Sequence, residues 1–215
     1  MVLGSKKSPS PRPKIDLFQV NLATIEFVNG NPQNPIVKIV DSVFEGLYEP
    51  WQDALVVSLL VKTMGYYMMK DRLVRLWRLK VGFGIMDIGN GYCLVKFEEE
   101  VDRTKVMDEG PWMIFYHYLT VQTWTPNFVS PKAKIKRTMV WIRFPRLNVF
   151  FYDESILMTL VGAVGKHVKV DRNTLDVKRG CFARVCVEVD LDKHIVGKVW
   201  LKGFWYNVKY EGLHT

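Results

Sequence analysis

Residues 51–124 follow an order of apolar patterns that restricts the fold more than any other feature of the chain. Short runs rich in β-branched and aromatic residues, typical of strands, alternate with segments whose apolar residues recur at helical spacing. The strand-like runs are 51–61, 83–88, 92–97 and 112–124, and the helix-like segments are 66–79 and 98–109. This β-α-β-β-α-β order predicts an α+β, ferredoxin-like fold. We expect a four-stranded antiparallel sheet with both helices on one face and the other face open.

Local signals support these boundaries. The apolar stripe of the first helix-like segment consists of Tyr66, Met69, Leu73, Leu76 and Trp77. Gly89, Asn90 and Gly91 predict a tight hairpin turn between two strands. Residues 98–109 begin with acidic side chains, which favours a helix N-terminus, and they end at Gly110-Pro111.

A second unit follows the first one. Residues 126–137 read as a basic linker containing proline, and residues 138–213 contain strand, helix and strand patterns in an order that echoes residues 51–124. Asp153 is the expected N-cap of its helix at 153–165. The last segment, 198–212, predicts a strand or hairpin. We therefore expect a second small α+β unit that arose by a degenerate duplication.

The N-terminal segments carry weaker patterns. Residues 1–14 are basic and rich in Ser and Pro, which predicts a disordered arm without the apolar core of a secretory signal. Residues 15–49 predict an irregular extension with at most one added strand. No apolar run reaches the length of a membrane span. We expect a protein of the nucleus or cytoplasm that is neither secreted nor bound to a membrane.

Charge is distributed unevenly along the chain. Residues 126–215 hold 16 basic and 8 acidic side chains, and this difference equals the net charge of +8 of the whole chain. A basic region beside a neutral one favours a polyanion partner. A solvated face that only aids solubility is the alternative.

The strand at 92–97 offers the first candidate site. Cys93, Val95 and Phe97 alternate with Tyr92 and Lys96, so the second set falls on the open face, where RNA-recognition modules stack bases on aromatic rings. Leu94 occupies the place of a second aromatic residue. The sequence therefore predicts weak base contacts by Tyr92 and Lys96. Alternatively, residues 15–49 or the second unit cover this face.

The linker and the second unit offer a larger candidate site. An outward aromatic side chain among cations is typical of surfaces that bind single strands, with modest specificity and strong salt dependence. The predicted contacts are Lys132, Lys134, Lys136, Arg137, Arg143, Lys166, Lys169, Arg172, Lys178, Arg179, Phe182 and Arg184. The predicted partner is RNA or single-stranded DNA, and self-association is a further alternative.

Catalytic, metal and cofactor motifs are absent from the sequence. The four histidines lack metal-ligand spacing, and no P-loop or nucleophile elbow occurs. We expect no enzyme, no metal and no cofactor.

Cys181 and Cys186 lie within an apolar alternation, so we expect both to be buried and unpaired. Five tryptophans are predicted to belong to the core: Trp51, Trp77, Trp112, Trp124 and Trp141. The patterns do not decide whether Trp200 and Trp205 belong to the core.

Eight stretches together resemble a known family. They are, in order, "WQDALVVSLL", "DIGNGYCLVKFE", "EGPWMIF", "VQTWTPNF", "VWIRFPRL", "VKVDRNT", "RGCFARVCVEVDL" and "VKYEGLHT". This series, over roughly residues 50–215, is similar to a plant domain of unknown function that occurs in LINE-type, non-LTR retrotransposon proteins and in genes derived from them.

The resemblance implies a gag-like protein that binds nucleic acid. In that family the region usually precedes a CCHC zinc knuckle, and "YEGLH" leads into its first cysteine. The knuckle is absent from this chain, so we expect a truncated relic or a fragment. Three functional hypotheses remain: a noncatalytic protein that binds nucleic acid, a protein-interaction or assembly scaffold, and a folded remnant without function.

Overall fold

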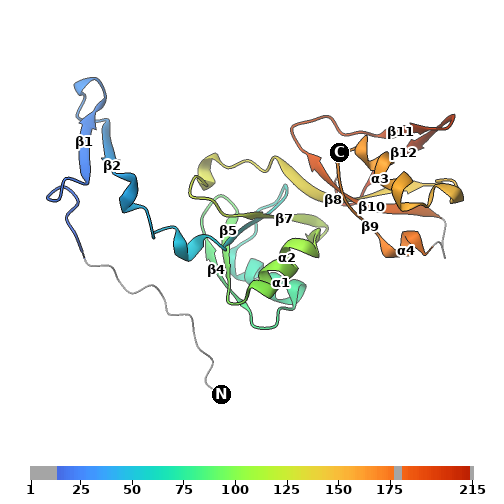
Figure 1. Ribbon diagram of the computed structural model, residues 1–215, viewed down its shortest axis with the longest axis horizontal. Coiled ribbons are helices and arrows are strands. Elements are labelled where there is room, and N and C mark those ends of the chain that lie inside the picture. The colour runs from blue at the N-terminus through green and yellow to red at the C-terminus, as the bar shows by residue number, and fades with distance from the viewer. Residues whose placement is uncertain (1–13, 177–180, 214–215) are drawn as a thin grey trace, which may run out of the picture.

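The chain forms an arm at residues 15–49 and two α+β units that follow one another along the molecule (Figure 1). The computed structural model describes residues 14–176 and 181–213. Within these residues the structure has four α-helices and mostly antiparallel sheets. No helix in the described part of the chain is long and apolar enough to cross a membrane. Nearly all of the predicted disordered arm at 1–14 lies outside the described residues.

The extension at 15–49 differs from the prediction. It forms a separate hairpin of two strands, β1 (Ala23–Phe27) and β2 (Pro35–Ile39), instead of adding at most one strand to another sheet. Asn29 and Gly30 turn the chain between them with positive φ angles of 52° and 73°, a conformation that Asn and Gly adopt readily. Figure 1 shows this hairpin projecting away from both units.

The first unit contains a five-stranded antiparallel sheet with the order β4-β5-β3-β7-β6. Its strands are β3 (Leu55–Leu59), β4 (Phe83–Asp87), β5 (Tyr92–Phe97), β6 (Trp112–Ile114) and β7 (His117–Thr123). Its helices are α1 (Tyr66–Trp77) and α2 (Glu100–Asp108). The predicted turn at Gly89–Gly91 is confirmed, since Tyr92 N–H donates to the Gly89 carbonyl at 3.0 Å.

Both helices cover the same face of this sheet. Alternation along the strands sends Leu55, Val57 and Val95 toward the helices, where they meet Leu73 and Trp77 of α1. The opposite set of strand residues forms a separate apolar cluster on the other face. The predicted helical stripe is confirmed at its centre, where Met69, Leu73 and Trp77 are buried.

The single long strand predicted at 112–124 is wrong. Phe115 and Tyr116 adopt positive φ angles of 50° and 65°, and they fold the segment into the β6–β7 hairpin. Aromatic residues rarely adopt this conformation, so the sequence carries no ordinary turn signal. The Arg72 guanidinium lies over the Phe115 ring at 4.3 Å from its centroid, which stabilises the turn from α1.

The second unit contains a four-stranded antiparallel sheet with the order β13-β8-β10-β9. Its strands are β8 (Arg137–Pro145), β9 (Lys166–Val170), β10 (Phe182–Asp190) and β13 (Lys209–Tyr210), and its helices are α3 (Glu154–Gly162) and α4 (Arg172–Leu175). The predicted N-cap is confirmed, because the Asp153 carboxylate accepts the Ile156 N–H at 3.1 Å. The predicted final strand or hairpin becomes a separate hairpin, β11 (Lys198–Leu201) and β12 (Phe204–Asn207), before β13.

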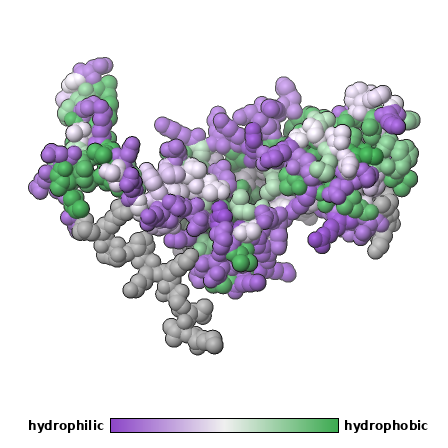
Figure 2. All heavy atoms as spheres, viewed as in Figure 1, coloured by the Kyte–Doolittle hydropathy of each residue, from purple (hydrophilic) through white to green (hydrophobic). Residues whose placement is uncertain are grey.

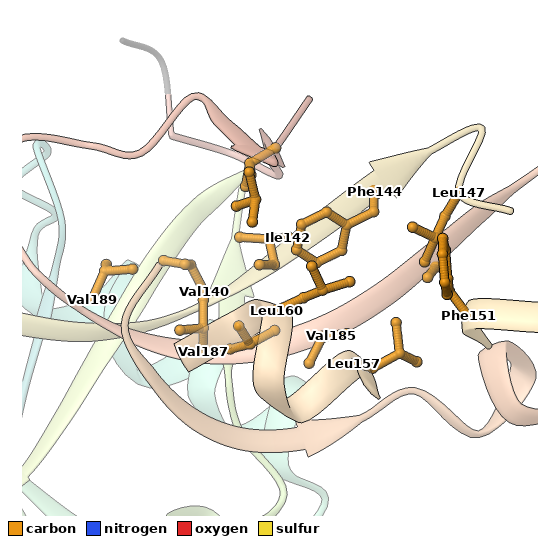
Figure 3. Packing of buried hydrophobic residues seen from close by; sticks show 14 of the residues in the cluster. Val140, Ile142, Phe144, Leu147, Phe151, Leu157, Leu160, Val185, Val187 and Val189 are labelled. Carbon is orange, nitrogen blue, oxygen red and sulfur yellow. The ribbon is translucent and has the colours of Figure 1, made fainter. Parts of the chain in front are cut away.

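The core of the second unit lies between this sheet and α3. Val140, Ile142 and Phe144 of β8 alternate inward and meet Leu157 and Leu160 of α3 (Figure 3). Inward positions on β10, which include Val185 and Val187, complete the layer. The outward positions of β8 and β10 therefore form the second face of this sheet.

Apolar and polar contacts join the two units. Tyr118 of β7 is buried against the core of the second unit, and its hydroxyl accepts the Trp141 N–H at 3.0 Å. The Lys169 ammonium donates to the carbonyls of Asp108 and Glu109 at 3.0 and 3.2 Å, where a cation also complements the C-terminus of α2. Gly212 has a φ of +67°, and a Cβ there would lie 2.9 Å from the Tyr116 carbonyl oxygen. A glycine is therefore required where the last segment crosses the β6–β7 turn.

Candidate nucleic-acid interface

The second face of the first sheet is covered rather than open. Phe128, Ala133 and Ile135 of the predicted linker pack on Val56, Tyr92 and Leu94. The Ser130 hydroxyl also donates to the Ile88 carbonyl at 2.6 Å. The linker is thus the main cover, which the sequence did not suggest. Residues 15–49, one of the two suggested segments, contribute Tyr48, whose ring lies 6.4 Å from that of Trp124 at the edge of the cluster.

Tyr92 is a core residue in this arrangement. Its ring is 6% exposed and meets the edge of Phe128 at 5.3 Å between centroids. Its hydroxyl donates to the Ala133 carbonyl at 3.2 Å, and burial raises its pKa. The prediction that Tyr92 presents its ring to a base therefore fails as the chain is folded here. Lys96 remains exposed, with its ammonium 5.7 Å from the centroid of the Trp51 ring.

The linker presents its basic residues to solvent. Ala133 and Ile135 face the sheet, and Lys132, Lys134 and Lys136 alternate with them on the exposed side. Arg137, at the start of β8, is exposed and lies 3.5 Å from a carboxylate oxygen of Glu188. The linker is therefore a strip with an apolar side that faces the sheet and a cationic side that faces solvent.

Arg184 lies at the centre of an ion-pair network on the second face of the second sheet. Its guanidinium donates to Asp171 at 2.7 Å and to both carboxylate oxygens of Glu211 at 2.8 and 2.9 Å. It also lies over the Trp141 ring, 4.0 Å from the centroid. The alternation predicted its outward direction correctly, but two carboxylates already occupy most of its donors.

The environment of Asp171 and Glu211 shifts the pKa values of both carboxylates. Burial by itself raises the pKa of Glu211 and that of Asp171. Hydrogen bonds from Arg184 to both, and from Arg143 to Glu211, outweigh burial and hold each pKa below its ordinary value. Both carboxylates are therefore ionised at neutral pH, and they offset the charge of the two arginines.

Arg143 and Phe182 lie beside this network. The Arg143 guanidinium donates to Glu211 and stacks over the Phe182 ring at 4.5 Å. Both residues line a hollow of about 630 Å³ that also contains Asp171 and Asp176. The predicted basic and aromatic side chains therefore do meet here, but in a hollow of mixed charge.

The other predicted contacts are dispersed. Lys166 and Arg172 are exposed, whereas Lys169 is engaged in the contact with α2. Lys178 and Arg179 lie outside the described residues. The structure therefore brings Arg143, Phe182 and Arg184 together, and the other predicted residues that it describes lie outside this group.

Four further cations of the second unit were not among the predicted contacts. Arg146, Lys198, Lys202 and Lys209 are exposed, and none of them forms an ion pair with another described residue. Lys209 lies opposite Arg143 in the sheet register, and Arg146 shares a hollow with β12. We call these four residues the basic end. Its sequence signal is that residues 137–152 and 193–210 hold seven basic residues and no acidic residue.

The cysteines and tryptophans divide into two classes. Cys93 and Cys186 are buried, and burial raises the pKa of each to about 11, so neither is a ready nucleophile. Cys181 is exposed, contrary to the prediction.

Trp77 is fully buried and the other four predicted core tryptophans are half-buried, whereas Trp200 and Trp205 are exposed. Across residues 14–176 and 181–213, no group of His, Cys, Asp and Glu could hold a metal ion.

Comparison with known proteins identifies one region of the chain. No curated protein and no solved structure matches the sequence. Residues 47–132 match the sequence model of a family described as "Domain of unknown function (DUF4283)". The match spans the first unit and the first part of the linker, and it ends just before Ala133 and Ile135. These residues are thus similar to a domain of unknown function, as the sequence resemblance predicted.

Proposed function

We propose that this chain binds single-stranded RNA or DNA through its second unit and performs no chemical step. The observation that carries the proposal is the basic end, four exposed cations of the second unit that form no ion pair with another described residue. Lysine and arginine contacts to phosphate supply most of the sequence-independent affinity for nucleic acid. The linker lysines are further exposed cations, at the opposite end of β8 from Arg146.

The ferredoxin-like and RNA-recognition-like arrangement is part of this proposal. When the short strand β6 and the β11–β12 hairpin are left out of the numbering, both sheets place the fourth, first, third and second strand side by side. In the order of elements along the chain, the β11–β12 hairpin of the second unit takes the place that α2 has in the first unit. This correspondence supports a duplication. An origin in a gag-like protein of a plant retrotransposon rests on the ordered sequence blocks.

The experiment that tests the location compares two variants of equal charge. The triple variant Lys198→Glu, Lys202→Glu and Lys209→Glu should bind a labelled single strand more weakly whatever its sequence. Its slope of log affinity against log salt should be smaller by about 2, since each lost phosphate contact removes about 0.7.

The matched control is Lys62→Glu, Lys70→Glu and Lys80→Glu, which changes three exposed lysines of the first unit. It alters the net charge equally and should retain the slope. Equal losses in both variants would mean that the binding surface is not the basic end.

One observation favours a second function, self-association through the arm. Figure 2 shows apolar surface on the arm. Its exposed apolar residues include the cross-strand pair Ile25 and Val37, and a lone two-stranded hairpin is marginally stable. Residues 15–49 carry five acidic side chains and one basic side chain, whereas residues 126–215 carry the excess of +8. A second copy of the chain therefore supplies a complementary surface.

The measurement for this function is the sedimentation of the full chain. We expect dimers or larger species that dissociate with salt and with the double variant Ile25→Lys and Val37→Lys. Val101→Lys, at an exposed position on α2, is the control. A monomer at every concentration would exclude this second function.

A further inference from the structure

The β11–β12 hairpin presents two tryptophans side by side on its outer face. Lys202 and Gly203 form its turn with positive φ angles of 45° and 91°. Alternation directs Val199, Leu201 and Tyr206 onto the core of the second unit. Trp200 and Trp205 are direct cross-strand partners and fall on the opposite face. The turn and the alternation thus place both indoles on one outward surface.

These two indoles are unusually open to solvent. Trp200 is 56% exposed and Trp205 is 66% exposed, although tryptophan is one of the largest apolar side chains to leave in water. Every other tryptophan in the described chain is buried or half-buried. Phe204, which pairs with Leu201 and so falls on the other face of the hairpin, is also exposed.

The charged residues on the hairpin and in the hollow at Trp205 are cations. Lys198 precedes Trp200 on β11, and Lys202 lies in the turn beyond it. Trp205 lines a hollow of about 410 Å³ together with Arg146. No aspartate or glutamate occurs in residues 193–210 or 137–152. An apolar surface flanked by cations is complementary to a ligand with flat rings and a polyanionic backbone.

We infer that Trp200 and Trp205 form a stacking platform for unpaired bases of a single-stranded nucleic acid, with the basic end holding the phosphates. This inference rests on the proposed function and assigns the base contacts within it. Every base has a π-face, so such a platform accepts any sequence. Bases in a duplex are already stacked on one another, so the platform discriminates single strands from duplexes.

A cross-strand aromatic pair also stabilises a hairpin, and a purely structural role makes a different prediction. A structural pair affects every ligand equally, through the fold. A stacking platform affects only ligands that carry unpaired bases. A strand of deoxyribose phosphate without bases separates these roles, because it retains the charges and lacks the rings.

The test measures the full chain against three ligands of about 12 nucleotides, a length within the usual site size of single-strand binders. They are oligothymidylate, an abasic strand of equal length and a duplex. Trp200→Ala and Trp205→Ala should each weaken oligothymidylate binding about five- to 150-fold, the range for the loss of one stacked base. Neither should change binding of the abasic strand or the duplex. Tyr67→Ala, at an 85% exposed aromatic residue on α1, is the control and should change nothing.

Thermal melting of each variant checks the fold, and Trp205→Phe keeps a flat ring and should retain most of the affinity. If the abasic strand binds as tightly as oligothymidylate, the inference that the two tryptophans stack on bases is wrong, while the proposed function stands. If neither ligand binds, the proposed function fails as well. If the tryptophan variants change only the oligomeric state of the protein, the surface is a protein contact and the inference is overturned.

Discussion

At the scale of single residues, Arg184 acts as a structural cation. Asp171 and Glu211 hold its guanidinium on two sides, and its side chain is 27% exposed. Strand alternation predicted which way Arg184 points, but it could not predict its partners, which lie 13 and 27 residues away in the sequence. A pattern within one strand reports the face that a side chain occupies and not the groups that the fold brings to that face.

Replacing Arg184 by methionine should destabilise the fold by about 2 kcal/mol, because two half-buried carboxylates lose their main donor. The network should also give the wild type an acid-dependent stability. The pKa values of Asp171 and Glu211 are lowered by folding, so their contribution is complete above their ordinary values and is lost as pH falls through the folded values.

Urea unfolding at several pH values between about 7 and about 3 measures both effects. The variant should lose less stability on acidification than the wild type. Arg172→Met, at an exposed site, should change stability by less than about 0.5 kcal/mol. An equal acid dependence in Arg184→Met and the wild type would contradict this account of the network.

At the scale of elements, prediction succeeded where the local signal is strong. The stripe of α1, the Asp153 cap of α3 and the Gly89–Gly91 turn each carry their own signature, and the structure contains all three. The β6–β7 hairpin was missed because its turn residues, Phe115 and Tyr116, are stabilised by distant contacts with Arg72 and Gly212. A covered face was one of the two alternatives, but the linker was not predicted to cover it, because the linker alternates over only a few residues.

The linker strip leads to a prediction about Tyr92. Tyr92→Leu removes the aromatic ring and the hydrogen bond to Ala133, so it should lower the free energy of unfolding by roughly 1–3 kcal/mol. It should leave the affinity for a single strand unchanged, since the ring lies beneath Phe128. Denaturant unfolding and fluorescence anisotropy on the same protein check the two parts. A large loss of affinity in a folded variant would show that the strip opens and that the first sheet contacts bases.

At the scale of the whole molecule, the two units form one assembly with separate surfaces. Tyr118 and Lys169 tie the units together, and the arm at 15–49 extends away from both. The charge excess in residues 126–215 was visible in the sequence, and it located the cationic half of the molecule. Its folded arrangement was not visible there, because ion pairs neutralise Arg184 and leave Lys198, Lys202 and Lys209 exposed.

The central claim is that the second unit binds single-stranded nucleic acid through exposed cations. The most direct measurement is the anisotropy of a labelled single-stranded oligonucleotide titrated with the full chain between about 50 and about 200 mM salt. The account predicts binding at the lowest salt and a steep linear fall of log affinity with log salt. No binding at about 50 mM salt, or an affinity that does not change with salt, would contradict it.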